Sequence, residues 1–337
     1  MAILAGGLLI LPTDPPEPPT PPTVAYREDV GTITASWIDP DGTEWPLSMT
    51  ADDIGWFTMN GPAGWGATPI ELVTDALSRG GEQVRFIRSK PRRIQWPVYV
   101  WGDDHMQYTE RNRRIMRAFT KTTQRATPGY LKIQRPDGRY RIIACYYEQG
   151  FEGEAEQGHL WSKYVIQLYC PDGYWSGDRA VLAERSFVAD LDPETGTPKT
   201  FYTPFMYLTS SQVVYDPGGG QVGNTSILNE GDVESWPEWT ITGPMTKATC
   251  QNLTLGLRFA LTHNLAAGQT IRITTNRPSV RGPGDANLSG KVDWFNPAGG
   301  AYLWPLADGD NDIRFVVDGA DVGTKITMAF TPRYESA

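Results

Sequence analysis

Hydrophobic and polar positions alternate over many short stretches of this chain, which is the pattern of half-buried β-strands. Residues 30–49 alternate in this way on either side of a turn at 39–42 (DPDG), and residues 130–148 do so around 135–138 (RPDG). In both turns a glycine can take the left-handed backbone angle that a tight hairpin needs. The pattern therefore predicts two β-hairpins, and a further strand over 160–170.

The segment between the two hairpins is harder to interpret. Residues 70–77 fit a strand or one helical turn, and residues 79–81 (RGG) end it. Residues 84–101 are strand-like, but Pro91 and Pro97 interrupt them. Because proline cannot donate to a β-ladder, the prolines predict edges or breaks rather than one long central strand.

One helix is predicted among the strands, over about residues 104–121. Tyr108, Ile115, Met116 and Phe119 fall at i, i+7, i+8 and i+11, so they share one side of a helix. Asp104 can cap it by accepting a hydrogen bond from the amide three residues later. Four arginines fill other positions, and they fit the rim of a sheet or, as the alternative, a DNA groove: Arg111, Arg113, Arg114 and Arg117.

The second half begins with residues 227–243 (ILNEGDVESWPEWTITG), a Gly-Asp turn followed by a short alternating strand. About six strands follow at spacings of roughly ten residues with turns between them, which predicts a β-sandwich. Residues 177–198 look like a connector, and the domain boundary is placed near Arg185. The predicted division is an apolar, proline-rich arm (1–23), a β-rich domain with one helix (24–185) and a sandwich (186–337).

Charge is distributed unevenly along the chain. The net charge is −9, but residues 79–141 hold sixteen Lys/Arg against five Asp/Glu, and the remainder holds fourteen against thirty-four. A basic block in an acidic protein fits nucleic-acid binding or, as we favour, a basic face that meets an acidic face of a neighbouring subunit. No stretch approaches the eighteen or so apolar residues of a membrane span.

Candidate catalytic and metal-binding groups are sparse. Residues 102–105 (GDDH) and the loop 282–287 (GPGDAN) carry possible ligands, but the first fits a helix cap and the second lacks the spacing of a calcium loop. Three cysteines form no CxxC pattern, and no nucleophile elbow or P-loop is present. We expect no cofactor, no metal and no catalytic residue, hence no enzyme.

Several segments, in order, resemble the siphophage distal tail proteins (Dit), a family of phage minor tail proteins. In the first half these are residues 92–94 (RRI) before the helix, 130–132 (YLK), the 137–138 hairpin turn, and 167–175 (QLYCPDGYW). In the second half they are 229–232 (NEGD), 236–237 (WP), 241–243 (ITG), 265–271 (LAAGQTI), 306–313 and 332–334 (PRY). The resemblance covers residues 24–337 and does not extend to the arm.

The resemblance implies a ring-forming N-terminal domain and an outward-facing galectin-like or carbohydrate-module-like sandwich. It implies a homo-oligomer, a hexamer, at the virion tail tip. This ring would be made in the host cytoplasm and would join the tail tube and the tape measure protein to the tail-tip hub. DNA would be met only as it passes through the ring. The basic block supplies the candidate subunit interface: Arg92, Arg93, Arg111, Arg114 and Arg117.

Two other functions fit the sequence. The first is a carbohydrate-binding adhesin, because three aromatic residues in the sandwich are candidates for stacking on sugars: Trp294, Tyr302 and Trp304. The second is a hydrolase, which would need a carboxylate essential for turnover of a cell-wall polymer. Measured self-association distinguishes the ring protein from both.

Overall fold

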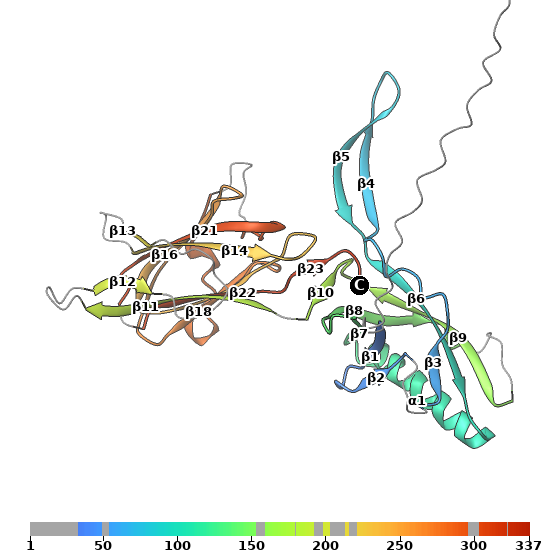
Figure 1. Cartoon of the computed structure of the whole chain (residues 1–337). Coiled ribbons are helices and arrows are strands. Elements are labelled where there is room, and N and C mark those ends of the chain that lie inside the picture. The colour runs from blue at the N-terminus through green and yellow to red at the C-terminus, as the bar shows by residue number, and fades with distance from the viewer. Residues whose placement is uncertain are drawn as a thin grey trace, which may run out of the picture.

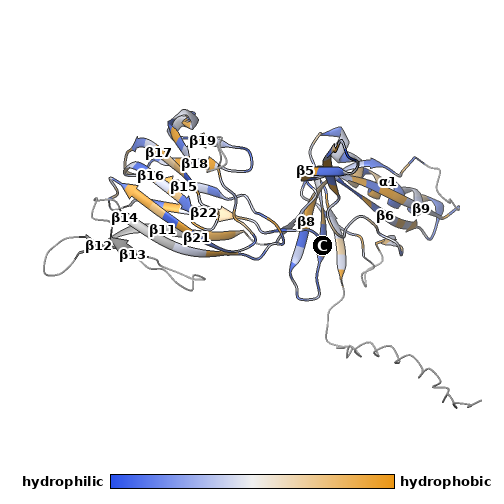
Figure 2. Ribbon diagram, turned by 90° about the horizontal axis from the view of Figure 1, so that it is seen from above, coloured by the Kyte–Doolittle hydropathy of each residue, from blue (hydrophilic) through white to orange (hydrophobic). Residues whose placement is uncertain are grey.

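The computed structural model describes residues 33–48, 54–152, 159–178, 180–191, 198–202, 213–215, 221–295, 303–321 and 323–337. These residues form two β-rich units that lie side by side (Figure 1). Seen from above, the two units are separate and a narrow connection joins them (Figure 2). Apolar residues are distributed over the strands of both units. The predicted arm, residues 1–23, lies outside the described residues.

The first unit is built on a sheet that runs in the order β2-β1-β7-β8-β9-β6-β3, with β10 and β23 paired at its side. Both predicted hairpins belong to it, since β1 pairs with β2 and β7 with β8. Gly138 has a φ of 82°, as its hairpin turn requires. The described strands of this sheet are β1 (Thr34–Ile38), β2 (Glu44–Pro46), β3 (Trp56–Thr58), β6 (Arg92–Trp101), β7 (Gly129–Gln134), β8 (Tyr140–Gln149), β9 (Trp161–Cys170), β10 (Trp175–Gly177) and β23 (Arg333–Tyr334).

The helix α1 (His105–Gln124) covers one face of this sheet. Asp104 caps it, because its carboxylate accepts a hydrogen bond of 2.8 Å from the amide of Gln107. Phe119 is fully buried and stacks on Trp37 of β1 with ring centroids 4.5 Å apart. The predicted helix, its cap and its apolar side are therefore confirmed.

Pro97 corrects the expected break in the strand. Pro91 does end one strand and begin another, but Pro97 lies inside β6, opposite Val165 of β9. The carbonyl of Pro97 accepts a hydrogen bond from Met59, beyond the end of β3, and in an antiparallel ladder the nitrogen faces the same side. The proline nitrogen, which carries no hydrogen, therefore faces the side on which β3 has already ended. No hydrogen bond between named strands is lost there.

The strands β4 (Ile70–Ala76) and β5 (Glu82–Ser89) form a separate two-stranded hairpin. It stands away from the first unit as a long protrusion (Figure 1). Residues 70–77 are therefore a strand and not a helical turn.

The second unit consists of two sheets, each six-stranded among the described residues, around one buried core. The mainly β fold with one helix is thus confirmed. The first sheet runs in the order β12 (Pro198–Tyr202), β11 (Val181–Leu191), β22 (Lys325–Phe330), β15 (Glu238–Thr242), β18 (Thr270–Thr274) and β19 (Ser279–Arg281). The second runs in the order β13 (Val213–Tyr215), β14 (Gln221–Asn229), β21 (Gly309–Asp318), β16 (Met245–Asn252), β17 (Leu257–Leu265) and β20 (Val292–Phe295).

The segment expected to be a connector contains a strand instead. β11 pairs with β22 from Val181 to Ser186 and then with β12. Arg185 therefore lies within a strand of the second unit. The sequence of β11, VLAERSFVADL, is rich in apolar residues and includes two valines and a phenylalanine, which favour a strand.

The end of the chain returns to the first unit. β23 pairs with β10, and the amide of Gly177 donates a 2.9 Å hydrogen bond to the carbonyl of Pro332. Beyond it, the amide of Ala337 donates to the carbonyl of Trp65. The two units are consequently joined by two neighbouring crossings of the chain.

Candidate assembly surfaces

The arginines predicted to form a subunit interface occupy three different settings. Arg114 and Arg117 are exposed on α1, and Arg114 lies over the ring of Trp45 at 5.3 Å. Arg111 is half-buried, donates to the carbonyl of Trp101 at 3.1 Å and lies over its ring. Of the helix arginines in the predicted set, Arg114 and Arg117 are thus the two available to another molecule.

Arg93 lies on the other face of the sheet from the helix. The neighbouring Ile94 packs into the core beneath α1, and side chains alternate along a strand. Arg93 forms an exposed ion pair with Glu148 at 2.9 Å and lies over the ring of Tyr169. The five predicted arginines therefore do not form one surface.

Arg92 corrects the prediction outright, because its side chain is buried and only 1% exposed. Its guanidinium donates to oxygens from three parts of the chain. These are the carbonyls of Gly64 and Gly66 (3.2 and 2.7 Å) with the hydroxyl of Thr68 (2.9 Å), the carbonyl of Gly173 (2.8 Å) and that of Glu335 (2.8 Å). Arg92 therefore ties β6 to two loops and to the end of the chain, and it presents no surface to a partner.

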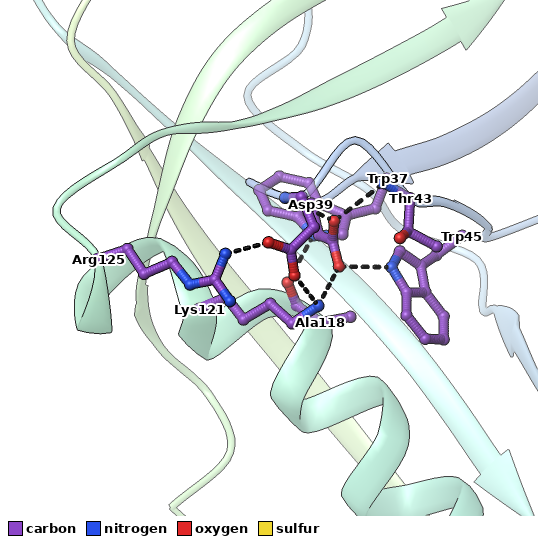
Figure 3. A network of polar contacts seen from close by, with 8 residues as sticks. Trp37, Asp39, Thr43, Trp45, Ala118, Lys121 and Arg125 are labelled. Carbon is purple, nitrogen blue, oxygen red and sulfur yellow. Dashed lines mark hydrogen bonds and ion pairs between the residues drawn. The ribbon is translucent and has the colours of Figure 1, made fainter.

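A second polar network attaches the first hairpin to the end of α1 (Figure 3). The Asp39 side chain is fully buried and accepts hydrogen bonds from the amides of Asp41 and Thr43, from the indole of Trp45 and, at 2.5 Å, from the ammonium of Lys121. Arg125 pairs with Asp41, as does Lys121 at 2.8 Å. The network holds the turn at 39–42 against the helix.

The charge of Asp39 predicts an acid-sensitive contribution to stability. Burial alone would raise its pKa, but hydrogen bonds from Lys121, the Thr43 amide and Trp45 lower the pKa of this carboxyl overall. A lowered folded-state pKa stabilises the fold above the unfolded value of about 3.9, and this stabilisation is lost as pH falls through the folded-state value. Asp39→Asn is expected to cost about 2 kcal/mol at pH 7.

Urea unfolding between pH 7 and pH 3 measures this effect. At pH 7 the wild-type chain should have the higher free energy of unfolding. Its difference from Asp39→Asn should shrink as pH falls below about 4, because protonation of Asp39 removes the charge that the variant already lacks. Asp137→Asn, in the exposed turn of the second hairpin, is the matched control and should follow the wild type. A constant difference between wild type and Asp39→Asn across this range would contradict the role of the charge.

The junction between the units carries charged contacts of its own. Arg333 binds Asp172 through both carboxylate oxygens at 2.9 and 3.1 Å, and Arg139 of the first unit reaches Glu230 of the second at 3.2 Å. Beside them is a cavity of about 210 Å³, lined by three arginines, two carboxylates and Tyr334 together with Tyr140 and Gly177. Charges of both signs line it, so it does not select for an anion.

The sandwich aromatics proposed to stack on sugars are placed differently from the expectation. Trp304 is fully buried, donates to the carbonyl of Cys250 at 3.3 Å and packs edge-on against Trp239, with centroids 5.1 Å apart. Its assignment to a sugar platform is therefore wrong, because no ligand can reach it. Trp294 is half-buried and packs against the same core, and Tyr302 lies outside the described residues.

The residues considered as metal ligands have structural roles. Asp104 caps the helix, and His105 stacks on His159 with ring centroids 4.7 Å apart while one ring nitrogen lies 3.0 Å from the carbonyl of His159. Among the described residues, no group of three or more His, Cys, Asp or Glu side chains could hold a metal ion. None of the helices in this part of the chain combines the length and hydrophobicity that a membrane crossing requires.

Two apolar surfaces were not singled out from the sequence. One is the protruding hairpin, with six exposed large side chains at its strands and turn: Ile70, Leu72, Leu77, Val84, Phe86 and Ile87. The other is the face of the sheet opposite α1, where Phe57, Tyr99, Trp101 and Trp161 stack on one another. Strand alternation could have revealed the second surface, but the protrusion of the hairpin has no local sequence signal.

No protein-family model matches the sequence, and neither does any curated protein. Among solved structures, the chain is similar to the SPP1 Dit protein (gp19.1), with a TM-score of 0.59 and 12% identity over 90% of this chain and 99% of that one. The chain has the fold of Dit. The likeness spans both units, so the Dit fold includes the sandwich as well as the first sheet. SPP1 Dit is described as a paradigm of the hub adsorption apparatus in phages that infect Gram-positive bacteria.

Two structures of the phage p2 baseplate in its activated conformation, with strontium and with calcium, also match. Their TM-scores are 0.49 and 0.48, at 13% and 12% identity, over 91% of this chain and the whole of theirs. At these scores they add no support to the Dit fold beyond that given by SPP1 Dit.

Proposed function

We propose that this chain is a non-enzymatic structural protein of a phage tail tip. In this role it forms a ring, a hexamer, that joins the tail tube and the tape measure protein to the hub that contacts the host. The observation that carries the proposal is the Dit fold across both units, together with the order of Dit-like segments in the sequence. The ring would reside in the virion and would meet DNA only during its passage through the channel.

The physical features of the chain support self-association. A closed ring is built from head-to-tail contacts, in which two different surfaces of one subunit meet. The first unit offers exposed arginines on α1, a protruding apolar hairpin and an aromatic sheet face, on different sides of the molecule. The adhesin alternative loses one of its three candidate stacking residues, because Trp304 is buried.

The mass of the purified full-length chain in solution tests the proposal directly. Light scattering on a sizing column should give about six times the chain mass, and negative-stain images should show rings with a central opening. A chain that stays monomeric at every concentration, and that is missing from assembled virions, would overturn the proposal. Glycan-array binding by a monomeric chain would support the adhesin instead.

A further inference from the structure

The β4–β5 hairpin has one mainly apolar face and a second face that carries its charged residues. Directly opposed residues of an antiparallel pair point to the same side of the sheet, and Leu72 opposes Ile87 while Thr74 opposes Val84. With Ile70, these residues form a face on which the large apolar side chains are 48–62% exposed. This surface is called the hairpin apolar face below.

The other face of the hairpin carries Phe86 opposite Val73, and charged residues that balance one another. Glu71 pairs with Arg88 at 2.5 Å, and Asp75 pairs with Arg85 at 3.3 Å. Because both ion pairs are formed within the hairpin, their charges are already neutralised and give no reason to expect a charged binding partner. The feature that remains unpartnered is the apolar face.

A hairpin of this kind needs a covering partner to be well ordered in water. An isolated two-stranded hairpin is marginally stable at best. The four exposed large side chains of the hairpin apolar face present on the order of 400 Å² of apolar surface, a size that often marks a functional patch on a monomer. A stable interface buries about 800 Å² on each partner. The hairpin apolar face could therefore supply about half of one side of an interface of this size.

A second surface, rich in aromatic rings, lies on the same chain, on strands β3, β6 and β9. It also holds Lys163, which opposes Tyr99 and whose ammonium lies over the ring of Trp161 at 5.3 Å. In β3, β6 and β9 the register aligns Phe57 with Tyr99 and Trp101 with Trp161, and Val165 lies opposite Pro97. The aromatic rings are half-buried, at centroid distances of 5.3 to 6.0 Å, and Val165 is 54% exposed. This surface is called the aromatic sheet face.

We infer that the hairpin apolar face of one copy packs on the aromatic sheet face of the next copy. The inference rests on the proposed ring, for which it supplies a subunit contact. The hairpin points away from its own first unit (Figure 1), and this position allows it to reach a neighbouring molecule. Because the two surfaces differ, one copy can bind one neighbour through its hairpin and another through its sheet face, and such head-to-tail contacts form a ring where the rotation between copies closes.

A charge placed on the hairpin apolar face tests the contact. Ile87→Lys is expected to weaken self-association at least tenfold, because the ammonium would lose its water and would be brought close to Lys163, whose ammonium already lies over the ring of Trp161. Ile87 is 62% exposed in the single chain, so the variant should fold normally. Gln83→Lys adds the same charge to the opposite face of the same hairpin, beside Asp75, and should associate as the wild type does.

Cross-linking tests the pairing of the two surfaces. The native thiols Cys145, Cys170 and Cys250 are buried, so a short bismaleimide should act on introduced cysteines. A chain carrying both Ile87→Cys and Val165→Cys should give a ladder of dimers, trimers and larger species. Each single variant should give monomers, and a mixture of the two single variants should give dimers.

The outcomes separate this contact from the proposed function. If the wild type forms rings and both Ile87→Lys and Val165→Lys do so equally well, the contact is wrong and the ring proposal stands. A wild-type chain that is monomeric at every concentration overturns the ring itself. If removing residues 1–23 abolishes association while Ile87→Lys does not, the apolar arm is the occupant and the inference is overturned.

Discussion

Replacing Arg92 with methionine is expected to lower the melting temperature of the first unit by about 8–16 °C, corresponding to about 4 kcal/mol. The side chain is 1% exposed and donates to five oxygens, none of which belongs to a carboxylate. Methionine has similar length but no donor, so several buried acceptors would lose their partners at once. Thermal unfolding followed by circular dichroism measures the loss.

Arg93→Met provides a control at the adjacent position. Arg93 is exposed and its ion pair with Glu148 is solvent-accessible, so this variant should melt close to the wild-type temperature. Arg92→Lys should be intermediate, because an ammonium has three donors and cannot span the same oxygens. Equal melting temperatures for Arg92→Met and Arg93→Met would contradict the central role of Arg92 in the first unit.

Replacing Trp304 with alanine is expected to destabilise the sandwich by about 3–5 kcal/mol, because the ring is removed from a close-packed aromatic cluster. Trp304 is fully buried and packs against Trp239 and Phe259 at centroid distances of 5.1 and 5.8 Å. The hydrogen bond to the Cys250 carbonyl is lost as well. Near-ultraviolet circular dichroism during urea unfolding should show the sandwich unfolding at lower denaturant.

Trp294→Ala is the matched control for this effect, since Trp294 is half-buried at the edge of the same core. We expect Trp294→Ala to lower the free energy of unfolding by less than half as much as Trp304→Ala does. The comparison bears on function, because a Trp304→Ala variant that lost glycan binding would have lost its fold rather than a contact with sugar. Equal stability of the Trp304→Ala and Trp294→Ala variants would show that the aromatic cluster is not the centre of the core.

Much of the fold could be predicted from patterns that span only a few residues of the sequence. The glycine-bearing turns of the two hairpins, the Asp104 cap and the spacing of Ile115 and Phe119 all act over a few residues, so the sequence exposes them. The strand at 238–242 was likewise evident from its alternation and its flanking Trp-Pro and Gly-Pro pairs. In each case the element is defined by groups close together in the chain.

The candidate site depended on distant groups and was therefore predicted poorly. The sequence alone did not distinguish Arg92 from its neighbour Arg93. The oxygens that bind Arg92 lie far away in the chain, as far as the carbonyl of Glu335, 243 positions on, so no local pattern shows that Arg92 is buried. Trp304 and Trp294 are the same residue type in the same domain, and only the packing of two sheets distinguishes them. The hairpin residues at 70–89 could be assigned to strands, but nothing local indicated that they leave the body of the first unit.

The return of the chain from β22 to β23 makes the sandwich an insertion, in topological terms, within the first unit. Residue 178 ends the outgoing passage, and Pro332, whose carbonyl bonds the amide of Gly177, ends the incoming one. Because the two ends of the sandwich leave the first unit so close together, the sandwich can be replaced by another domain or by a short loop without interrupting the sheet of the first unit. The sandwich can therefore diversify in sequence while the sheet of the first unit stays constant.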